Sequence, residues 1–509
     1  LAVLILRFSV ISSAFRTTMS DQFSKTVFCL PDSSSSHNLD CGDFEWKVDF
    51  VHPSLTLNCQ PRGNKETLLW RCDAKIKIVA VEKYSERLCC EMLGLTFNSH
   101  KKSSESRSEL CRTSSAAVKL ELNVLIIRSY VIDLSSATNA LVLGSCDAAR
   151  FEIDGRVVYL SKHILTRCSP FFNAMFNRDF LEKTTDSYAL REVDFRQVLH
   201  LMAIIHRKTA FIDASSVAYL AKLADMYCVR EIADLCKEFL LCDEEIEDRE
   251  IVREHLSRLD NEKIVIESKA QVQRSFGHAP LSFEIGAFQC KLNLSLNFFS
   301  YNSIMMTMSP QDKNRNLMWH CVAQLKSVEE YVNESLQQED TFSFRNSVCE
   351  QWVKVADDRL KLCFNVNIIE SDVIDLSSPE NKLLSDPTDA VSLQIDGEKL
   401  WFSKKFLTLT CPVFGDSFKS PEKLYIVYNV KHIQFLHFMA LLHLTKFQID
   451  AHSVQYLLIL ADRFNCDYVT DRCELFLRDK KCELGRDYCA QLADWHNLIG
   501  LMTKLKVKS

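Results

Sequence analysis

The hexapeptide VIDLSS occupies residues 131–136 and returns at residues 373–378. When the two stretches are aligned, residues 131–176 and 373–418 are identical at almost half of their positions, far above the level of unrelated chains. The alignment breaks at a short deletion in the second copy and resumes downstream, where Ile-Asp-Ala and later Ala-Asp recur in both copies. The chain therefore contains an internal duplication.

The chain has 509 residues, a length that predicts three or four domains rather than one. Apolar residues make up 47% and charged residues 25%, as in soluble globular proteins. The net charge of −6 argues against a nucleic-acid partner, because phosphate binding calls for an excess of cations. With only 11 glycines, glycine-rich phosphate loops are not expected either.

Upstream of each repeated segment, apolar residues occur at every second position. Residues 118–126 and 360–368 alternate in this way, and shorter runs at 55–59 and 74–78 do the same. This period of two is typical of half-buried strands. The upstream part of each copy is therefore predicted to be an all-β sandwich.

Downstream, the period changes to that of helices. A short strand at residues 151–153 leads through an Asp154-Gly155 turn to Ser161, a suitable N-cap, and Pro170 separates the first helix from the next. Asp213 is predicted to cap a later helix. Each copy thus combines a β part with a mainly helical α/β part.

The downstream parts resemble the BTB (POZ) domain in the version found in MATH-BTB proteins. The motifs that carry the resemblance in the first copy are LSKHIL at 160–165, CSPFF at 168–172, YLAKLAD at 219–225 and CKEFL at 236–240. In the second copy they are FSKKFL at 402–407, CPVF at 411–414 and YLLILAD at 456–462.

The upstream parts resemble divergent MATH domains, on FEW at 44–46, LWRC at 69–72 and TFSF at 341–344. The resemblance implies an α+β multidomain protein in which two β-sandwich MATH-like domains alternate with two BTB domains. The expected parts are a disordered or non-native segment (1–40), MATH-like domain 1 (41–134), BTB domain 1 (146–242), an acidic helical linker (243–275), MATH-like domain 2 (276–376), BTB domain 2 (388–480) and a helical extension (481–509).

The same resemblance implies a cullin-3 contact at Phe180, Leu181 and Glu182, where cullin-binding BTB domains have a hydrophobic-x-Glu motif. An aromatic anchor with a charged neighbour is a plausible binding hot spot. The alternative is that Phe180 packs on its own domain and Glu182 is solvated. In the second copy the deletion falls here and Pro421 replaces the spacer, so the second BTB domain is not expected to bind cullin.

The chain is therefore expected to be a non-catalytic substrate adaptor of a cullin-3 RING ubiquitin ligase, located in the cytoplasm or the nucleus. Its MATH-like domains would bind protein targets, and its BTB domains would pair within or between chains. The other reading is a BTB-mediated scaffold without a role in ubiquitin transfer. Membrane partners are not expected, and the family's groove residues do not align well enough to assign a substrate groove.

No catalytic, cofactor or metal site is expected. The cysteine series Cys466, Cys473, Cys482 and Cys489 lies among helical segments, where buried thiols are a simpler explanation than zinc ligands. His432, His437 and His443 have apolar neighbours, and core or surface positions are expected for them rather than metal-ligand positions.

Three further predictions concern the acidic segment, the N-terminal residues and the cysteines. Residues 243–262 are rich in carboxylates but carry apolar residues at helical spacing, which predicts an amphipathic helix covering the end of the first BTB domain, with a longer cullin contact as the alternative. Residues 1–18 precede the first methionine, Met19, and are expected to lie upstream of the true start rather than to form a secretory leader. The 21 cysteines are expected to be reduced.

Overall fold

The structure is a computed structural model. The residues that it describes are 22–29, 35–51, 54–63, 66–82, 88–106, 118–144, 146–177, 187–242, 246, 249–260, 268–274, 281–295, 302–330, 335–345, 350–355, 361–384, 386–419, 424–443, 448–479 and 482–507.

The chain divides into two compact units, which are treated separately below. The first unit comprises residues 1–259, 408–415 and 449–509, and the second comprises 260–407 and 416–448. Helices from the end of the chain therefore belong with its beginning.

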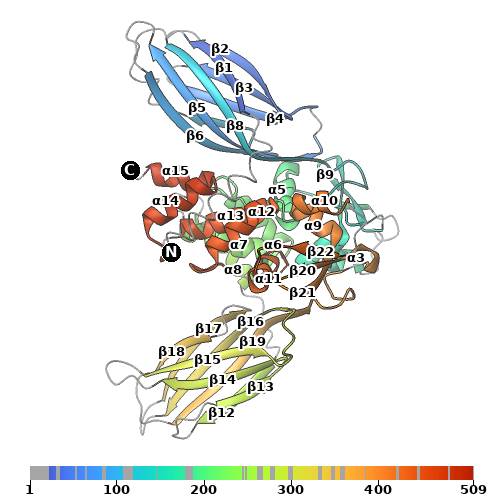
Figure 1. The fold of residues 1–509 in the computed structure, drawn as a ribbon, viewed down its shortest axis with the longest axis vertical. Helices are drawn as coiled ribbons and strands as arrows, with labels where there is room; N and C mark the ends of the chain where they lie inside the picture. Colours follow the sequence, from blue (N-terminus) through green and yellow to red (C-terminus); the bar gives the residue numbers. More distant parts are fainter. Residues whose placement is uncertain are drawn as a thin grey trace. The chain divides into compact units, whose positions relative to one another are not determined.

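The first β module consists of two antiparallel four-stranded sheets in the first unit (Figure 1). The sheets share one apolar core, in which Trp46 packs edge-on against Phe97 with ring centroids 5.1 Å apart. One sheet has the order β1 (Gln22–Cys29), β8 (Val118–Asp133), β5 (Leu68–Glu82), β6 (Leu88–Asn98), and the other β2 (Ser35–Cys41), β3 (Phe44–Val51), β4 (Ser54–Pro61), β7 (Ser103–Ser106).

Strands β1 and β2 correct the prediction for residues 1–40. That segment was expected to be disordered or non-native, but β1 pairs along its whole length with β8, and β2 pairs with β3. Long polar stretches obscure the alternation here, so only the pairing partners reveal the strands. Residues 1–21 lie outside the described part of the chain.

The repeated hexapeptide joins the β module to the next domain. Its backbone bonds to both neighbours. The N–H of Leu134 donates to Thr67 O (3.1 Å), and the carbonyl oxygen of Leu134 accepts from Tyr159 N (2.9 Å). The buried amide of Asn139 then donates to the carbonyls of Ser136 and Tyr159, both at 2.8 Å. These bonds tie the hexapeptide and the residues just after it to both neighbouring domains.

The first α/β module follows. Strand β11 lies parallel to β9, and β10 returns from β9 through a turn in which Asp154 and Gly155 have φ of 49° and 73°, the left-handed pair of a type I′ hairpin. Its elements are β9 (Ala148–Ile153), β10 (Arg156–Ser161), β11 (Ser187–Leu190), α2 (Lys162–Cys168), α3 (Pro170–Asn177), α5 (Phe195–Ile205), α6 (Val217–Met226), α7 (Arg230–Cys242) and α8 (Arg249–Asp260).

Of the two predicted helix N-caps, Ser161 is confirmed and Asp213 is wrong. Ser161 caps α2, since its side chain accepts from Ile164 N at 3.1 Å. The prediction for Asp213 is wrong, because α6 begins at Val217 and Ser216 is its N-cap residue. Asp213 instead precedes the helix in a turn, where its N–H donates to Ser216 Oγ at 2.8 Å.

The acidic segment contains the predicted amphipathic helix, α8. Val252, Leu256 and Leu259 are buried, and His255 Nδ1 lies 2.9 Å from Asp225 Oδ2 on α6, so the helix covers the end of the module. Ile251, expected on the same apolar face, is 52% exposed.

Four C-terminal helices complete the first unit. They are α12 (Val454–Phe464), α13 (Asp467–Arg478), α14 (Arg486–Trp495) and α15 (Ile499–Val507), and the last two form the predicted helical extension. Helix α15 packs on β6 so closely that a Cβ on Gly94 would lie 2.8 Å from Ile499 Cγ2. A side chain at residue 94 would push the helix away.

The second unit repeats the β module with the same strand order (Figure 1). Phe288 and Trp319 lie in its core, with ring centroids 5.7 Å apart. The sheets are β12 (Ser268–Arg274), β19 (Lys361–Asp375), β16 (Leu317–Glu330), β17 (Ser335–Arg345), and β13 (Leu281–Ile285), β14 (Phe288–Ser295), β15 (Asn302–Pro310), β18 (Glu350–Val355). Strand β12 falls in the predicted linker 243–275, so that linker ends earlier than expected.

The joining bonds recur in this unit. Leu376 N donates to Asn316 O, Trp401 N donates to Leu376 O, and the Asn381 amide donates to Trp401 O. Beyond the joint lie a short 3-10 helix, η2 (Pro387–Asp389), a sheet of β20 (Ala390–Ile395), β21 (Glu398–Ser403) and β22 (Leu424–Val427), and helix α11 (His432–His443); α9 (Lys404–Thr410) and α10 (Pro412–Ser417) span the boundary of the units.

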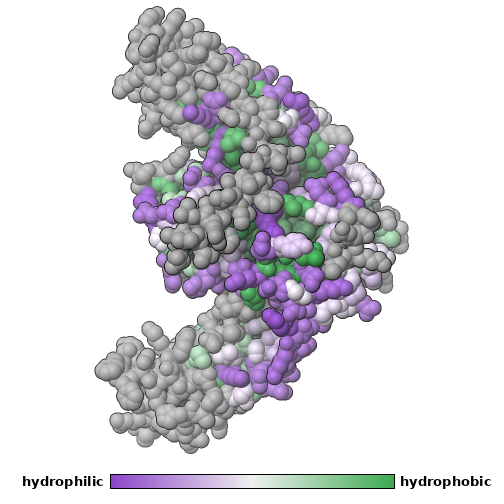
Figure 2. Space-filling model, viewed as in Figure 1, coloured by the Kyte–Doolittle hydropathy of each residue, from purple (hydrophilic) through white to green (hydrophobic). Residues whose placement is uncertain are grey.

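The fold is thus mixed α/β with several small sheets. In the view of Figure 2, hydrophilic residues cover most of the coloured surface, and hydrophobic ones gather over the helical part of the chain. Among the described residues, no helix is long and apolar enough to cross a bilayer.

We predict that Asn139→Ala destabilises the first unit by about 1–3 kcal/mol, because the carbonyls of Ser136 and Tyr159 lose their amide donor in a partly buried joint. The urea midpoint of the full chain should fall accordingly. Thr138→Ala, at an exposed neighbouring position, should leave the midpoint nearly unchanged. Equal effects of the two substitutions would contradict the role given to the amide.

Candidate functional site

The predicted cullin contact lies outside the described residues, which stop at Asn177 and resume at Ser187. Phe180, Leu181 and Glu182 therefore stay predictions. The structure does show how their flanks are anchored. Phe176 at the end of α3 is buried against Tyr188 on β11, with ring centroids 5.0 Å apart.

A buried cluster of charges lies in the first unit, where the β module meets the helices. Arg71 on β5 donates from Nε to Asp73 Oδ1 (2.9 Å) and from Nη2 to Asp471 Oδ1 on α13 (3.0 Å). Arg128 on β8 reaches Asp73 at 2.8 Å and Asp471 at 3.4 Å. Thr209 Oγ1 donates to Asp471 Oδ2 at 2.8 Å.

The two arginines decide the charge state of Asp471. Burial raises the pKa of its carboxyl group, but the Arg71 and Arg128 guanidinium groups outweigh burial and hold that pKa below its ordinary value. The carboxylate also accepts from Ala210 N at 3.0 Å. Removal of one partner from such a buried pair typically costs about 3–5 kcal/mol.

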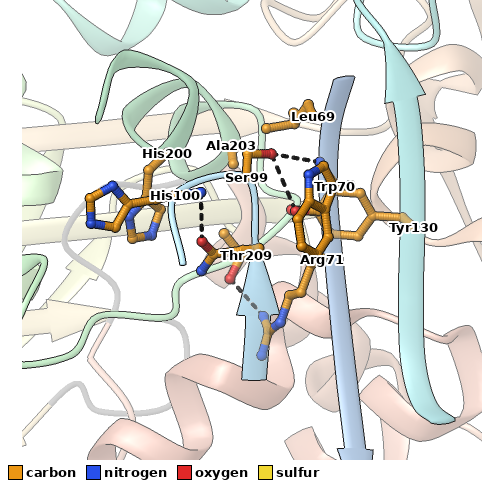
Figure 3. Close-up of a pocket in the computed structure, with 10 residues that line it drawn as sticks. Leu69, Trp70, Arg71, Ser99, His100, Tyr130, His200, Ala203 and Thr209 are labelled. Atoms are coloured by element: carbon orange, nitrogen blue, oxygen red, sulfur yellow. Dashed lines mark hydrogen bonds between the residues drawn. The ribbon is translucent and has the colours of Figure 1, made fainter. Parts of the chain in front are cut away.

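Figure 3 shows the small cavity beside this cluster, with Trp70, Arg71 and Tyr130 on one side and His100 and His200 on the other. Its volume is about 10 Å³, room for one water at most. Burial lowers the pKa of His200 to about 4, so this ring is neutral, and its nitrogens lie 2.6 Å from Tyr219 Oη and 2.9 Å from Phe211 O. The arrangement is a packed junction rather than a ligand site.

A second polar network joins α7 to α13. Glu231 is buried, lies 2.7 Å from Arg207 Nη1 and accepts from Tyr468 Oη at 2.5 Å. Arg472 donates to Glu238 at 3.3 Å. The helices of the two sequence copies are therefore bonded to each other within one chain.

Sequence reasoning missed both networks. Arg71 and Asp73 occupy the face of β5 opposite its apolar residues, which usually indicates exposure to solvent. Their burial comes from Asp471, 400 residues away in the chain. Lys75 and Lys77 continue the same alternation, so nothing in the local sequence distinguishes Arg71 and Asp73 as buried.

The structure separates the cysteine series. The Cys466 thiol is hydrogen-bonded to Cys411, whereas Cys489 is hydrogen-bonded to Cys482. Burial raises the pKa of Cys489 to about 11. Cys473 is also buried, and no cluster of potential metal ligands occurs within the described ranges.

The three histidines lie on α11. His432, His437 and His443 are buried, and His443 stacks on Phe406 with ring centroids 4.3 Å apart. These positions agree with the predicted core role.

Comparison with protein families adds the decisive observation. The model of the BTB/POZ domain matches residues 145–244 and again residues 380–481. The chain contains two BTB/POZ domains. These ranges are called BTB1 and BTB2 below; they carry the motifs on which the resemblance rested, and BTB/POZ domains mediate protein–protein interaction.

The curated relatives are BTB and MATH domain-containing proteins of Caenorhabditis elegans. Protein 36 is 30% identical over 115 residues, which cover 21% of this chain and 35% of that protein. Protein 38 is 26% identical over 216 residues, which cover 38% of this chain and 52% of that protein. The chain thus spans between a third and a half of the length of these relatives.

Among solved structures, Streptomyces albus HEPD with bound 2-hydroxyethylphosphonate and Fe(II) aligns over 67% of this chain and 76% of its own, with 11% identity. The TM-score of 0.09 is too low to carry any argument about fold or function.

BTB2 differs from BTB1 along its edge strand β22 and at the start of helix α11. Ile426, Tyr428 and Ile433 are 49%, 66% and 40% exposed. The aligned residues of BTB1 are Ala189, Arg191 and Arg196. The second copy therefore presents large apolar side chains where the first presents small or cationic ones.

We predict that Asp471→Asn lowers the free energy of unfolding of the full chain by about 3–5 kcal/mol at pH 7, because Arg71 and Arg128 lose their shared anion. The folded-state pKa of Asp471 is depressed, so its contribution is complete above the unfolded pKa near 3.9 and is lost as the pH falls toward the folded value.

The difference in free energy of unfolding between the parent chain and the Asp471→Asn variant, measured by urea denaturation, should therefore shrink as the pH falls from 5 to 3. Asp494→Asn, on the exposed side of α14, serves as the control and should change stability little at any pH. A difference independent of pH would rule out a charge-based role.

Proposed function

We propose that the chain is a non-catalytic adaptor of a cullin-3 RING ubiquitin ligase. In this proposal the two β modules are divergent MATH domains that bind target proteins, and BTB1 binds the cullin. The observation that carries the proposal is Phe180-Leu181-Glu182, placed just after the buried Phe176 of α3. The cytoplasm or the nucleus is the expected location.

The architecture supports this division of labour. Each β module continues through a hydrogen-bonded joint into a BTB domain, so a target on the β module would be held at a high effective concentration beside the ligase. The proposed order along the chain is MATH, BTB, MATH, BTB. The names of the relatives contain the same two domain types.

Only BTB1 is proposed to bind cullin. The corresponding stretch of BTB2 does not keep the hydrophobic-x-Glu spacing and has Pro421 before Glu422. This segment lies outside the described residues. Phe418, just before it, is buried and packs against Tyr425 with ring centroids 4.8 Å apart.

We also propose that the BTB domains pair within one chain. The bonds from Glu231 and Glu238 on α7 to α13 are buried or half-buried and run between the two copies. A second chain would have to replace these contacts in order to form an exchanged pair. A scaffold without ubiquitin chemistry is the competing function, and it would use the same pairing.

We predict that Phe180→Ala combined with Glu182→Lys abolishes capture of cullin-3. Loss of an apolar anchor and reversal of a charge should cost several kcal/mol of binding free energy, since a single hot spot contributes about 2 kcal/mol or more. A pull-down of purified full-length chain with purified cullin-3 measures this directly.

Glu422→Lys is the matched control in the second copy and should leave capture intact. Undiminished binding by the double variant would exclude the proposed contact. Absence of cullin binding by the parent chain would instead favour the scaffold.

We predict that the chain is monomeric at micromolar concentration. Light scattering should give a mass near 58.6 kDa, because the pairing faces are already satisfied within the chain. A dimer that persists on dilution would show that the copies pair between chains.

A further inference from the structure

A polar cavity of about 400 Å³ lies in the first unit, between the first β module and BTB1. This volume falls in the range of small-molecule and side-chain binding sites. Its lining includes the apolar side chains of Trp70, Phe195 and Leu199, which are called its floor, and charged residues from four separate segments, which are called its wall.

Three carboxylates of the wall already have partners. Arg156 bonds Glu66 at 2.6 Å and Asp154 at 2.7 Å, and its guanidinium group stacks over Phe195. Asp194 caps α5 by accepting from Gln197 N at 2.9 Å. The negative charges are thus committed to structural bonds.

Two cations of the wall are not committed in this way. The described residues place no carboxylate within ion-pair distance of Lys102 or Arg196. Burial lowers the pKa of the half-buried Lys102, the positive charge of Arg196 lowers it further, and Glu66 offsets part of this effect. Two like charges that face a shared cavity repel each other until an anion lies between them.

We propose that this cavity binds a phosphorylated serine or threonine side chain of a partner protein. A phosphate group carries nearly two negative charges and several acceptor oxygens, which match the ammonium group of Lys102 and the guanidinium group of Arg196. The apolar floor would contact residues beside the phosphate. The proposal does not depend on cullin binding.

The second copy serves as an internal comparison. Ile433 replaces Arg196, whereas Lys431 replaces Asp194, so the charges are arranged differently there. The ion pair between Glu66 and Arg156 has a counterpart with exchanged charges in the second copy. Arg315 takes the place of Glu66 and lies 3.1 Å from Glu398, which takes the place of Arg156. The structural bond is therefore retained, whereas the cation of Arg196 belongs to the first copy alone.

The test uses the full-length chain and a degenerate peptide library with phosphoserine fixed at its centre. Matched libraries carry serine or aspartate at that position, and fluorescence anisotropy measures binding. We expect the phosphoserine library to bind at least tenfold more tightly than either control. Equal binding of the aspartate library would overturn the assignment to phosphate, and equal binding of the serine library would overturn any anion site.

Lys102→Gln combined with Arg196→Gln should weaken phosphopeptide binding at least tenfold. Arg253→Gln removes a cation from the exposed face of α8, away from the cavity, and should have no effect. An unchanged thermal midpoint will show that the double variant is folded. Full binding by a folded double variant would overturn the proposal, and cullin-3 capture by the same variant should be normal, which separates this test from that of the adaptor function.

Discussion

The carboxylate of Asp471 is the constraint on which the first unit depends. It is buried, it accepts hydrogen bonds from Arg71, Thr209 and the backbone of Ala210, and it thereby joins a strand near the start of the chain, a loop after α5 and a helix near the end. Because an unpaired buried charge is costly, separating any one of these three segments from the others would strongly destabilise the first unit. The entire second β module lies in the chain between the loop after α5 and the C-terminal helix. The segments before and after this insertion therefore both belong to the first unit.

Local patterns in the sequence predicted most of the elements. Alternation gave β8 and β19, and Ser161 gave the start of α2, because these features depend on neighbours in the chain. Strands β1 and β12 were missed because β1 lacks a regular alternation, β12 is largely polar, and the identity of both rests on distant partners. The charged networks were beyond reach for the same reason: nothing near Arg71 in the sequence indicates that Asp471 will cover it.

The two copies have kept the joints and changed the surfaces. Asn139 and Asn381 make the same bonds to the following strand, and the bulge in the long central strand pair recurs at Asp73 and at Val322. In contrast, His320 and Val322 stand where the first copy has Arg71 and Asp73, so the second sequence does not keep these two charges. The two copies thus share one frame and differ in the side chains that face their own surroundings.

The exchanged ion pair has a consequence for how the chain sorts its own parts. Each β module meets the hairpin turn of its own BTB domain through one cation and one anion, as Glu66 with Arg156 and as Arg315 with Glu398. If a newly made chain docked the first β module on the turn of the second copy, Glu66 would face Glu398, and the converse error would set Arg315 against Arg156. Like charges would thus discourage both errors. The exchanged charges therefore favour the contact of each β module with the turn of its own BTB domain.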